Sequence, residues 1–156
     1  MQQVLLLSGT EDSDISAVAN SLCERFDKML LLPAADMNQF IQAGLQEIGV
    51  VTTSAIEQKI LGIRNSISIA ANAIDMRYGV IIIDYLDEMS IEIYKTECLK
   101  LNVAPVHLIF LNQSSTTINN PELISHVLDC DLELNPVEKA DQIQKIIGSN
   151  QSLLTT

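Results

Sequence analysis

Positive charge is scarce in this 156-residue chain. The sequence has 9 lysine and arginine residues against 20 aspartate and glutamate residues, and its net charge at pH 7 is -11. A protein with this excess of negative charge repels phosphate backbones and anionic lipid headgroups. We therefore expect neither nucleic acid nor a membrane surface as a partner.

Paired cysteines and long apolar runs are also missing. Cys23, Cys98 and Cys130 lie far apart and form no C-x-x-C motif, which fits reduced thiols in the cytoplasm. The first apolar run, residues 4–7, is too short for a membrane span, and no positive charge precedes it as in a signal peptide. Both absences predict a cytoplasmic location.

The chain contains enough apolar residues to form one hydrophobic core. Hydrophobic residues make up 47% of the sequence, as in an ordinary globular domain of this length. No internal repeat or long linker divides the chain. We expect a single domain over residues 1–148, followed by a flexible tail over residues 149–156.

Apolar runs alternate with helical patterns along the chain. Strands are expected at about residues 3–7, 29–32, 80–84, 106–111 and 131–134. Helices are expected at about residues 13–26, 36–48 with Asp36 as N-cap, 54–77 closed by Gly79, 88–101, 121–128 and 136–147. This alternation predicts an α/β fold with three layers, α/β/α, and a mostly parallel five-stranded sheet. The fully apolar first, third and fourth strands should be central.

Ligands bind such sheets at the carboxyl ends of the strands. The polar segments expected there are the turn that begins at Gly9, the residues Asp36 and Asp84, and the uncharged loop 112–120. The turn after the first strand has the length of a P-loop, G-x-x-x-x-G-K-[ST]. Gly9 holds the first glycine and Ser16 the hydroxyl, but Asp14 stands at the second glycine and Ile15 at the lysine.

Four segments resemble the P-loop kinases of small molecules, closest to the chloramphenicol phosphotransferase and gluconate- and shikimate-kinase-like group. They are the strand and turn through Ser16-Ala-Val-Ala-Asn-Ser-Leu, the acid Asp36 after the second strand, Arg77-Tyr-Gly before V-I-I-I-D, and the closing D-L-E-L-N-P-V-E-K. The resemblance implies the P-loop NTPase topology of nucleotide kinases. In such a kinase Gly9, Ser13, Asp14 and Ser16 would surround the phosphates of ATP, Ser16 and Asp84 would hold magnesium, and Asp36 would be the catalytic base.

The charges of the turn argue against that activity. Ile15 supplies no cation, while Glu11, Asp12 and Asp14 place carboxylates where nucleotide phosphates would lie. Two like charges about 4 Å apart repel by roughly 4 kcal/mol at an effective dielectric near 20, about a thousandfold in affinity. The loop 112–120 also lacks the arginines that stabilise phosphoryl transfer. The sequence therefore predicts a non-catalytic, pseudokinase-like binding or regulatory module without a cofactor.

Two other functions and folds stay open. The chain could be an ATP-dependent small-molecule phosphotransferase with an atypical P-loop, its cation supplied from elsewhere. It could also be a flavodoxin-like or receiver domain, although Glu11 and Asp12 come too late for a receiver acid pair and 134–136 offers no lysine. In simpler interpretations, Asp84 is a strand-end residue, Arg64 lies on the surface, and His107 is a hydrogen-bonded core residue.

The long helix 54–77 carries two apolar sets. One runs from Ile56 to Ile74, and the other comprises Leu61, Ile69, Ala73 and Met76. Such a helix is either enclosed in the core or pairs with another chain. We therefore expect a protein partner or a homo-oligomer, and a small-molecule ligand remains possible.

Overall fold

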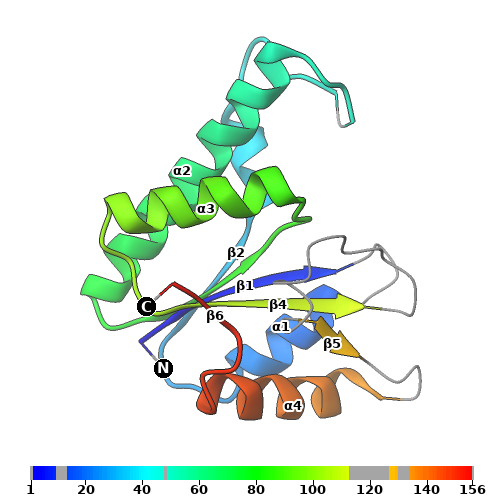
Figure 1. Cartoon of the computed structure of the whole chain (residues 1–156), viewed down its shortest axis with the longest axis vertical. Coiled ribbons are helices and arrows are strands. Elements are labelled where there is room, and N and C mark those ends of the chain that lie inside the picture. Colours follow the sequence, from blue (N-terminus) through cyan, green and yellow to red (C-terminus); the bar gives the residue numbers. More distant parts are fainter. Residues whose placement is uncertain (1, 10–13, 48, 113–126, 130–133, 156) are drawn as a thin grey trace.

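The computed structural model describes residues 2–9, 14–47, 49–112, 127–129 and 134–155. Its centre is a parallel sheet with the strand order β2 (Met29–Pro33), β3 (Gly79–Ile83), β1 (Val4–Gly9), β4 (Val106–Asn112) and β5 (Val127–Asp129) (Figure 1). A short strand, β6 (Leu153–Thr155), pairs antiparallel with β4. The predicted central position of the three apolar strands is confirmed, because β3, β1 and β4 are flanked on both sides.

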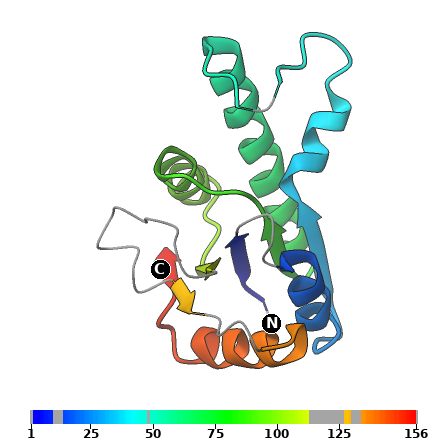
Figure 2. The same cartoon turned by 90° about the vertical axis from the view of Figure 1, so that its right-hand side faces the viewer.

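Helices cover both faces of the sheet. The helices α1 (Ile15–Cys23) and α4 (Pro136–Gly148) lie on one face, and α2 (Thr53–Asp75) and α3 (Glu88–Lys100) lie on the other (Figures 1 and 2). Side chains alternate along β1, so that Val4 and Leu6 join the core under α2 and α3, while Leu5 and Leu7 join the core under α1 and α4. The three-layer α/β/α fold is the one predicted. No helix among the described residues is long and apolar enough to cross a bilayer.

One part of the molecule projects from these layers. The 3-10 helix η1 (Ala34–Phe40) is followed by an irregular segment and then by α2, and together they rise away from the sheet (Figures 1 and 2). The buried residues of α2 begin only at Ile63. We refer to residues 38–62 as the arm.

The prediction of a helix over residues 36–48 is wrong. Asp36 lies inside η1 and is no N-cap; its carboxylate accepts a hydrogen bond of 3.0 Å from the Gln39 side chain. The described residues 41–47 form no helix, and Gly44 has a φ of 79°. The apolar stripe that predicted the helix has no surface to pack on, since Phe40 is 75% exposed. Without burial, helical spacing has little to stabilise it.

Gly79 does not close the long helix either. Arg77 takes the left-handed conformation, with a φ of 64°, and the amide of Tyr78 donates to the carbonyl of Ala73 at 2.9 Å. The amide of Arg77 donates to Ile74 at 2.8 Å, which completes the Schellman pattern. Gly79 instead opens β3.

The end of the chain also differs from the expected flexible tail. Residues 153–155 form β6 along β4, and Ser152 is buried. The Ser152 hydroxyl lies 2.9 Å from Nδ1 of His107, which is buried and hydrogen-bonded as expected. The loop 113–120, most of the helix expected at 121–128 and most of the strand expected at 131–134 lie outside the described residues. Where that helix should have ended, Val127–Asp129 form β5.

Candidate functional site

The ends of β1 and β3 meet at the carboxyl edge of the sheet. Leu7 of β1 is in register with Ile83 of β3. Beyond them, the amide of Asp84 donates to the carbonyl of Leu7 at 3.2 Å, and the amide of Leu86 donates to Oγ of Ser8 at 3.0 Å. The connection between β3 and α3 is therefore fastened to the end of β1, and Asp84 lies beside that strand end.

The turn between β1 and α1 keeps an unusual backbone at Asp14. This residue caps α1 with a φ of 49° and a ψ of 25°, and its carboxylate forms no capping hydrogen bond. Glycine adopts that left-handed conformation without steric cost, whereas other residues are strained. Asp14 thus has a glycine-like backbone at the position of the second P-loop glycine. Ser16 is exposed in the first turn of α1, and Ser13 lies outside the described residues.

Ile15 is a core residue. Its side chain is 7% exposed and belongs to the apolar cluster of α1, α4 and the sheet, with Leu5 and Leu7. A lysine at this position would bring its ammonium group toward an apolar interior, where an unpaired charge is costly. The residue that stands at the P-loop lysine therefore contributes to folding rather than to the polar edge.

The connection between β3 and α3 is polar and well bonded. The hydroxyl of Tyr94, a fully buried residue of α3, donates to Oδ2 of Asp84 at 2.8 Å. Burial raises the pKa of Asp84, and the hydrogen bond from Tyr94 and the charge of Lys59 oppose that rise. Burial beside this carboxylate also raises the pKa of Tyr94 far above its ordinary value. The hydroxyl therefore remains a hydrogen-bond donor to Asp84.

Asp87 organises the start of α3. Its Oδ1 accepts hydrogen bonds from the amide of Ser90 at 2.8 Å and from the Ser90 hydroxyl at 2.5 Å, and its Oδ2 accepts one from Nζ of Lys59 at 2.7 Å. Burial by itself would raise the pKa of Asp87, but the bonds from Lys59 and Ser90 outweigh it and lower the pKa to about 2. Asp87 is therefore held as a carboxylate.

Lys59 is the functional candidate that sequence reasoning missed. It lies on α2, 28 residues before Asp87, and only the packing of α2 against α3 brings the two together. Among the ion pairs of the described residues, this is the one that involves the connection between β3 and α3. The other basic residue considered, Arg64, is on the surface as expected and pairs with Glu97 at 3.1 Å.

The predicted site residues are only partly brought together. Gly9 and Asp84 share the carboxyl edge, and Asp14 and Ser16 begin the helix that follows Gly9. Asp36 is exposed on η1 and contacts Gln39. No cluster of three histidine, cysteine, aspartate or glutamate side chains that could hold a metal is found in the described part of the chain.

A groove of about 530 Å³ lies between α1 and the start of α4. Its described lining includes two carboxylates, Glu24 and Glu138, and no basic side chain; the lining residues are Ala17, Asn20, Ser21, Glu24, Asn135, Pro136, Val137 and Glu138. The groove therefore lies along α1 and the first turn of α4. The Arg25 guanidinium beside the groove is already paired with Asp141, so the two lining carboxylates disfavour a phosphate and favour a neutral polar or cationic group.

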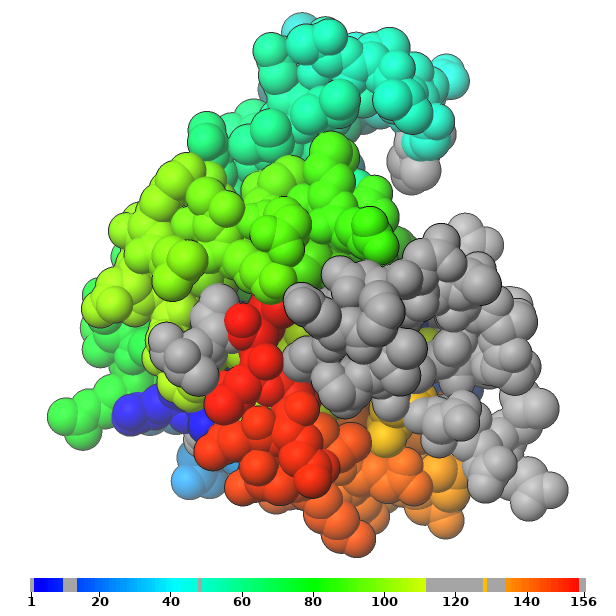
Figure 3. Space-filling view, viewed as in Figure 1, coloured from blue at the N-terminus to red at the C-terminus, as the bar shows by residue number. Residues whose placement is uncertain are grey.

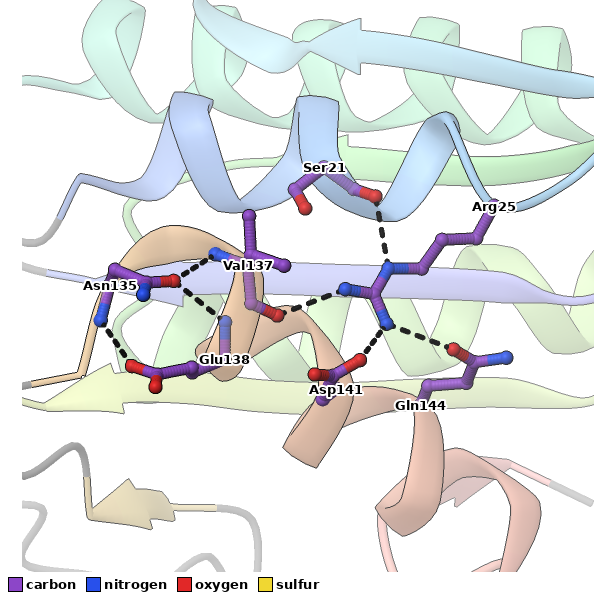
Figure 4. A network of polar contacts seen from close by, with 7 residues as sticks. All are labelled: Ser21, Arg25, Asn135, Val137, Glu138, Asp141 and Gln144. Carbon is purple, nitrogen blue, oxygen red and sulfur yellow. Dashed lines mark hydrogen bonds and ion pairs between the residues drawn. The ribbon is translucent and has the colours of Figure 1, made fainter.

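A polar network holds the walls of this groove together (Figure 4). The Arg25 guanidinium at the end of α1 donates to the carbonyls of Ser21 at 3.1 Å and Val137 at 2.9 Å. The same group donates to Gln144 at 3.1 Å and pairs with Asp141 on α4. At the start of α4, the side chain of Asn135 caps the helix, and that of Glu138 accepts from the Asn135 amide. The network fixes α1 against α4.

Solved structures with the same fold are kinases and a resistance protein. The APS kinase of Mycobacterium tuberculosis matches with a TM-score of 0.66 and 12% identity over 94% of this chain and 96% of that one. The tunicamycin resistance protein of Deinococcus radiodurans matches with a TM-score of 0.65 and 12% identity over 99% of each chain. A sugar kinase from Janibacter sp. matches with a TM-score of 0.60 and 11% identity over 94% of each chain. No protein-family model and no curated protein matches the sequence. The fold is that of the P-loop kinases.

Proposed function

We propose that this chain, with its P-loop kinase fold, is a non-catalytic relative of small-molecule kinases that acts as a binding or regulatory module. The observation that carries the proposal is the burial of Ile15 in the core between α1 and the sheet. A P-loop needs a lysine at this position to reach the terminal phosphates. Here the position stabilises the fold and offers nothing to an anion.

The distribution of the basic residues supports the same proposal. All 9 lysines and arginines of the sequence lie in the described part of the chain. Five of them form ion pairs with acidic side chains of the described residues, and of these five Lys59 reaches the carboxyl edge, where Asp87 already neutralises it. Three further carboxylates in the turn after Gly9, at Glu11, Asp12 and Asp14, would repel a triphosphate.

Calorimetric titration with ATP, ADP and magnesium tests the proposal. We expect no heat of binding and no thermal shift up to about millimolar nucleotide, a bound set by the roughly thousandfold loss that a single charge conflict causes. Binding near micromolar affinity that Ser16→Ala abolishes would overturn the proposal. Transfer of the terminal phosphate to any acceptor would overturn it as well.

An active phosphotransferase is the alternative, and the backbone of Asp14 favours it. The left-handed φ of 49° is the conformation that a glycine would provide in a working loop. Under this alternative Ser16 and Asp84 hold magnesium, Asp36 is the base, and Lys59 leaves Asp87 to supply the missing cation. Lys59→Met would then abolish ATP binding, while Lys95→Met, on an exposed ion pair of α3, would leave it unchanged.

The proposed role needs a partner in the cytoplasm. The described cysteines, Cys23 and Cys98, are free thiols, and burial raises the pKa of both, as fits unreactive reduced cysteines. The acidic groove beside α1 could receive a neutral or cationic small molecule, and the surfaces outside the sheet could receive a protein.

A further inference from the structure

The arm exposes apolar side chains that the rest of the fold leaves uncovered. Val51 is 89% exposed, Phe40 75%, Leu45 55% and Leu61 50%. The arm stands clear of the body in the space-filling view (Figure 3). With Val50 these side chains expose on the order of 500 Å² of apolar surface, near the upper end of what a monomer carries without a binding role.

The outer part of the arm carries little charge in a strongly acidic protein, since Glu57 and Lys59 lie near its base, where Lys59 pairs with Asp87. Residues 37–56 contain a single charged residue, Glu47, although the whole chain has a net charge of -11. A basic partner protein would be attracted to the acidic body and would find little to pair with on the arm. An uncharged apolar surface instead suits a partner with the same composition.

The length of the arm reduces the charge repulsion between two copies of this protein that are in contact through their arms. Two copies of a chain with a net charge of -11 repel one another unless their bodies are kept apart. The residues of α2 that precede the contact of Lys59 with Asp87, 53–58, contain no buried residue and extend about 9 Å at 1.5 Å per residue. That distance exceeds the screening length of about 8 Å at physiological salt, so arms in contact leave the bodies largely screened.

We propose that a second copy of this chain covers the arm, in a two-fold dimer whose arms pack side by side. The apolar surface of two arms amounts to about 1,000 Å², the lower limit for a specific interface, which predicts a dimer of modest affinity. This placement revises the expected helix stripe: Ile69 and Ala73 pack against the core, whereas Leu61 is exposed. The dimer does not depend on whether the P-loop-like turn binds nucleotide.

Sedimentation equilibrium of the full chain tests the dimer, at protein concentrations from about 1 to about 100 µM. We expect a monomer–dimer equilibrium that tightens when salt is raised from about 50 to about 500 mM, because salt screens the repulsion between the two bodies. A wild-type protein that stays monomeric over this range overturns the proposal. A dimer that weakens with salt also overturns it, since charge attraction would then hold the copies together.

Matched variants locate the interface. The double variant Phe40→Glu with Val51→Glu adds charge at two exposed positions and should weaken the dimer by at least about tenfold without lowering the melting temperature. Leu99→Glu changes a side chain that is 70% exposed on α3, outside the arm, and should leave the dimer unchanged. A dimer lost in Leu99→Glu but kept in the double variant would place the interface elsewhere and overturn the proposal.

Discussion

The start of α1 and the connection between β3 and α3 differ in how they use their polar groups. The connection between β1 and α1 places Ile15 in the core and leaves the carboxylate of Asp14 without a capping bond. The connection between β3 and α3 joins Asp84 to Tyr94 and Asp87 to Lys59 and Ser90. At the start of α1, the apolar Ile15 occupies the position of the P-loop lysine. In the connection between β3 and α3, each described carboxylate accepts hydrogen bonds.

The difference shows that the carboxyl edge of the sheet can keep its backbone arrangement although polar side chains are used differently at its two parts. The bonds from Asp84 to Leu7 and from Leu86 to Ser8 hold the connection between β3 and α3 against the end of β1, whatever the turn after Gly9 binds. The structural role of the edge is therefore separable from a catalytic role. Substitutions in each connection should distinguish the structural role of the edge from a catalytic role.

The largest expected effect comes from restoring the lysine. Ile15→Lys puts an ammonium group at a position that is 7% exposed, and it should lower the free energy of unfolding by about 3 kcal/mol. Ile15→Met, which keeps an apolar side chain of similar volume, should cost about 1 kcal/mol or less. Urea denaturation measures both. An Ile15→Lys protein as stable as the wild type would show that residue 15 can turn toward the edge.

The next effect concerns the buried hydrogen bond of the second connection. Tyr94→Phe removes the donor to Oδ2 of the partly buried Asp84 carboxylate, which among the described residues keeps only its bond from the Tyr85 amide, at a cost of about 1.5 kcal/mol at neutral pH. Tyr85→Phe, at a neighbouring residue that is 56% exposed, serves as the control and should cost almost nothing. Equal losses in the two variants would contradict a special role for the Tyr94 hydroxyl.

A smaller effect tests the backbone of the first connection. Asp14→Gly and Asp14→Ala remove the same carboxylate, but glycine accepts a φ of 49° without strain and alanine does not. The glycine variant should be more stable than the alanine variant by about 1 kcal/mol in urea denaturation. If alanine is as stable as glycine, the left-handed conformation at this residue is not maintained in solution.

The smallest expected effect is on the pH dependence of stability, to which Asp87 and Asp84 contribute in opposite directions. The folded pKa of Asp87 is about 2, below the unfolded value of about 3.9, so its contribution is present above that value and is lost as the pH falls toward 2. Asp87→Asn should therefore destabilise the protein at pH 7, by about 0.5 kcal/mol for this exposed pair, and not in acid.

Asp84 should behave in the opposite sense. Its folded pKa is raised, so its ionisation disfavours the folded state once the pH exceeds the unfolded value of about 3.9. Asp84→Asn should gain a few tenths of a kcal/mol at pH 7 and nothing in acid, because the amide oxygen still accepts from Tyr94. Unfolding curves from about pH 3 to about pH 7 compare the two variants, and slopes of the same sign would refute the assignment.

The sequence predicted the central layer well because burial dictates it. The run 80–83 and, apart from His107, the run 106–111 are apolar and must be covered on both faces, which makes them central strands. The arm could not be predicted in this way. The spacing of Phe40 and Leu45 assumes a buried helix face, and no neighbour in the fold provides one. Helix spacing therefore indicated amphipathicity there without indicating a partner for it.

The candidate site was predicted in part for a related reason. Gly9 and Asp84 could be placed at one edge because parallel strands bring their carboxyl ends together. Lys59 could not, since nothing local links it to Asp87 28 residues later. The core position of Ile15 could not be predicted either. The sequence shows that the P-loop lysine is missing, but it does not show that the residue in its place is buried.

The last strand has a practical consequence for handling this protein. Among the described residues, β5 pairs with β4 at Phe110, Leu111 and Asn112, and β6 covers Val106 and His107 on the same strand. Uncovered strand edges invite pairing with other molecules and lead to aggregates. Deleting residues 152–155, or fusing a bulky label directly to β6, should therefore reduce solubility before it alters the fold of the remaining chain.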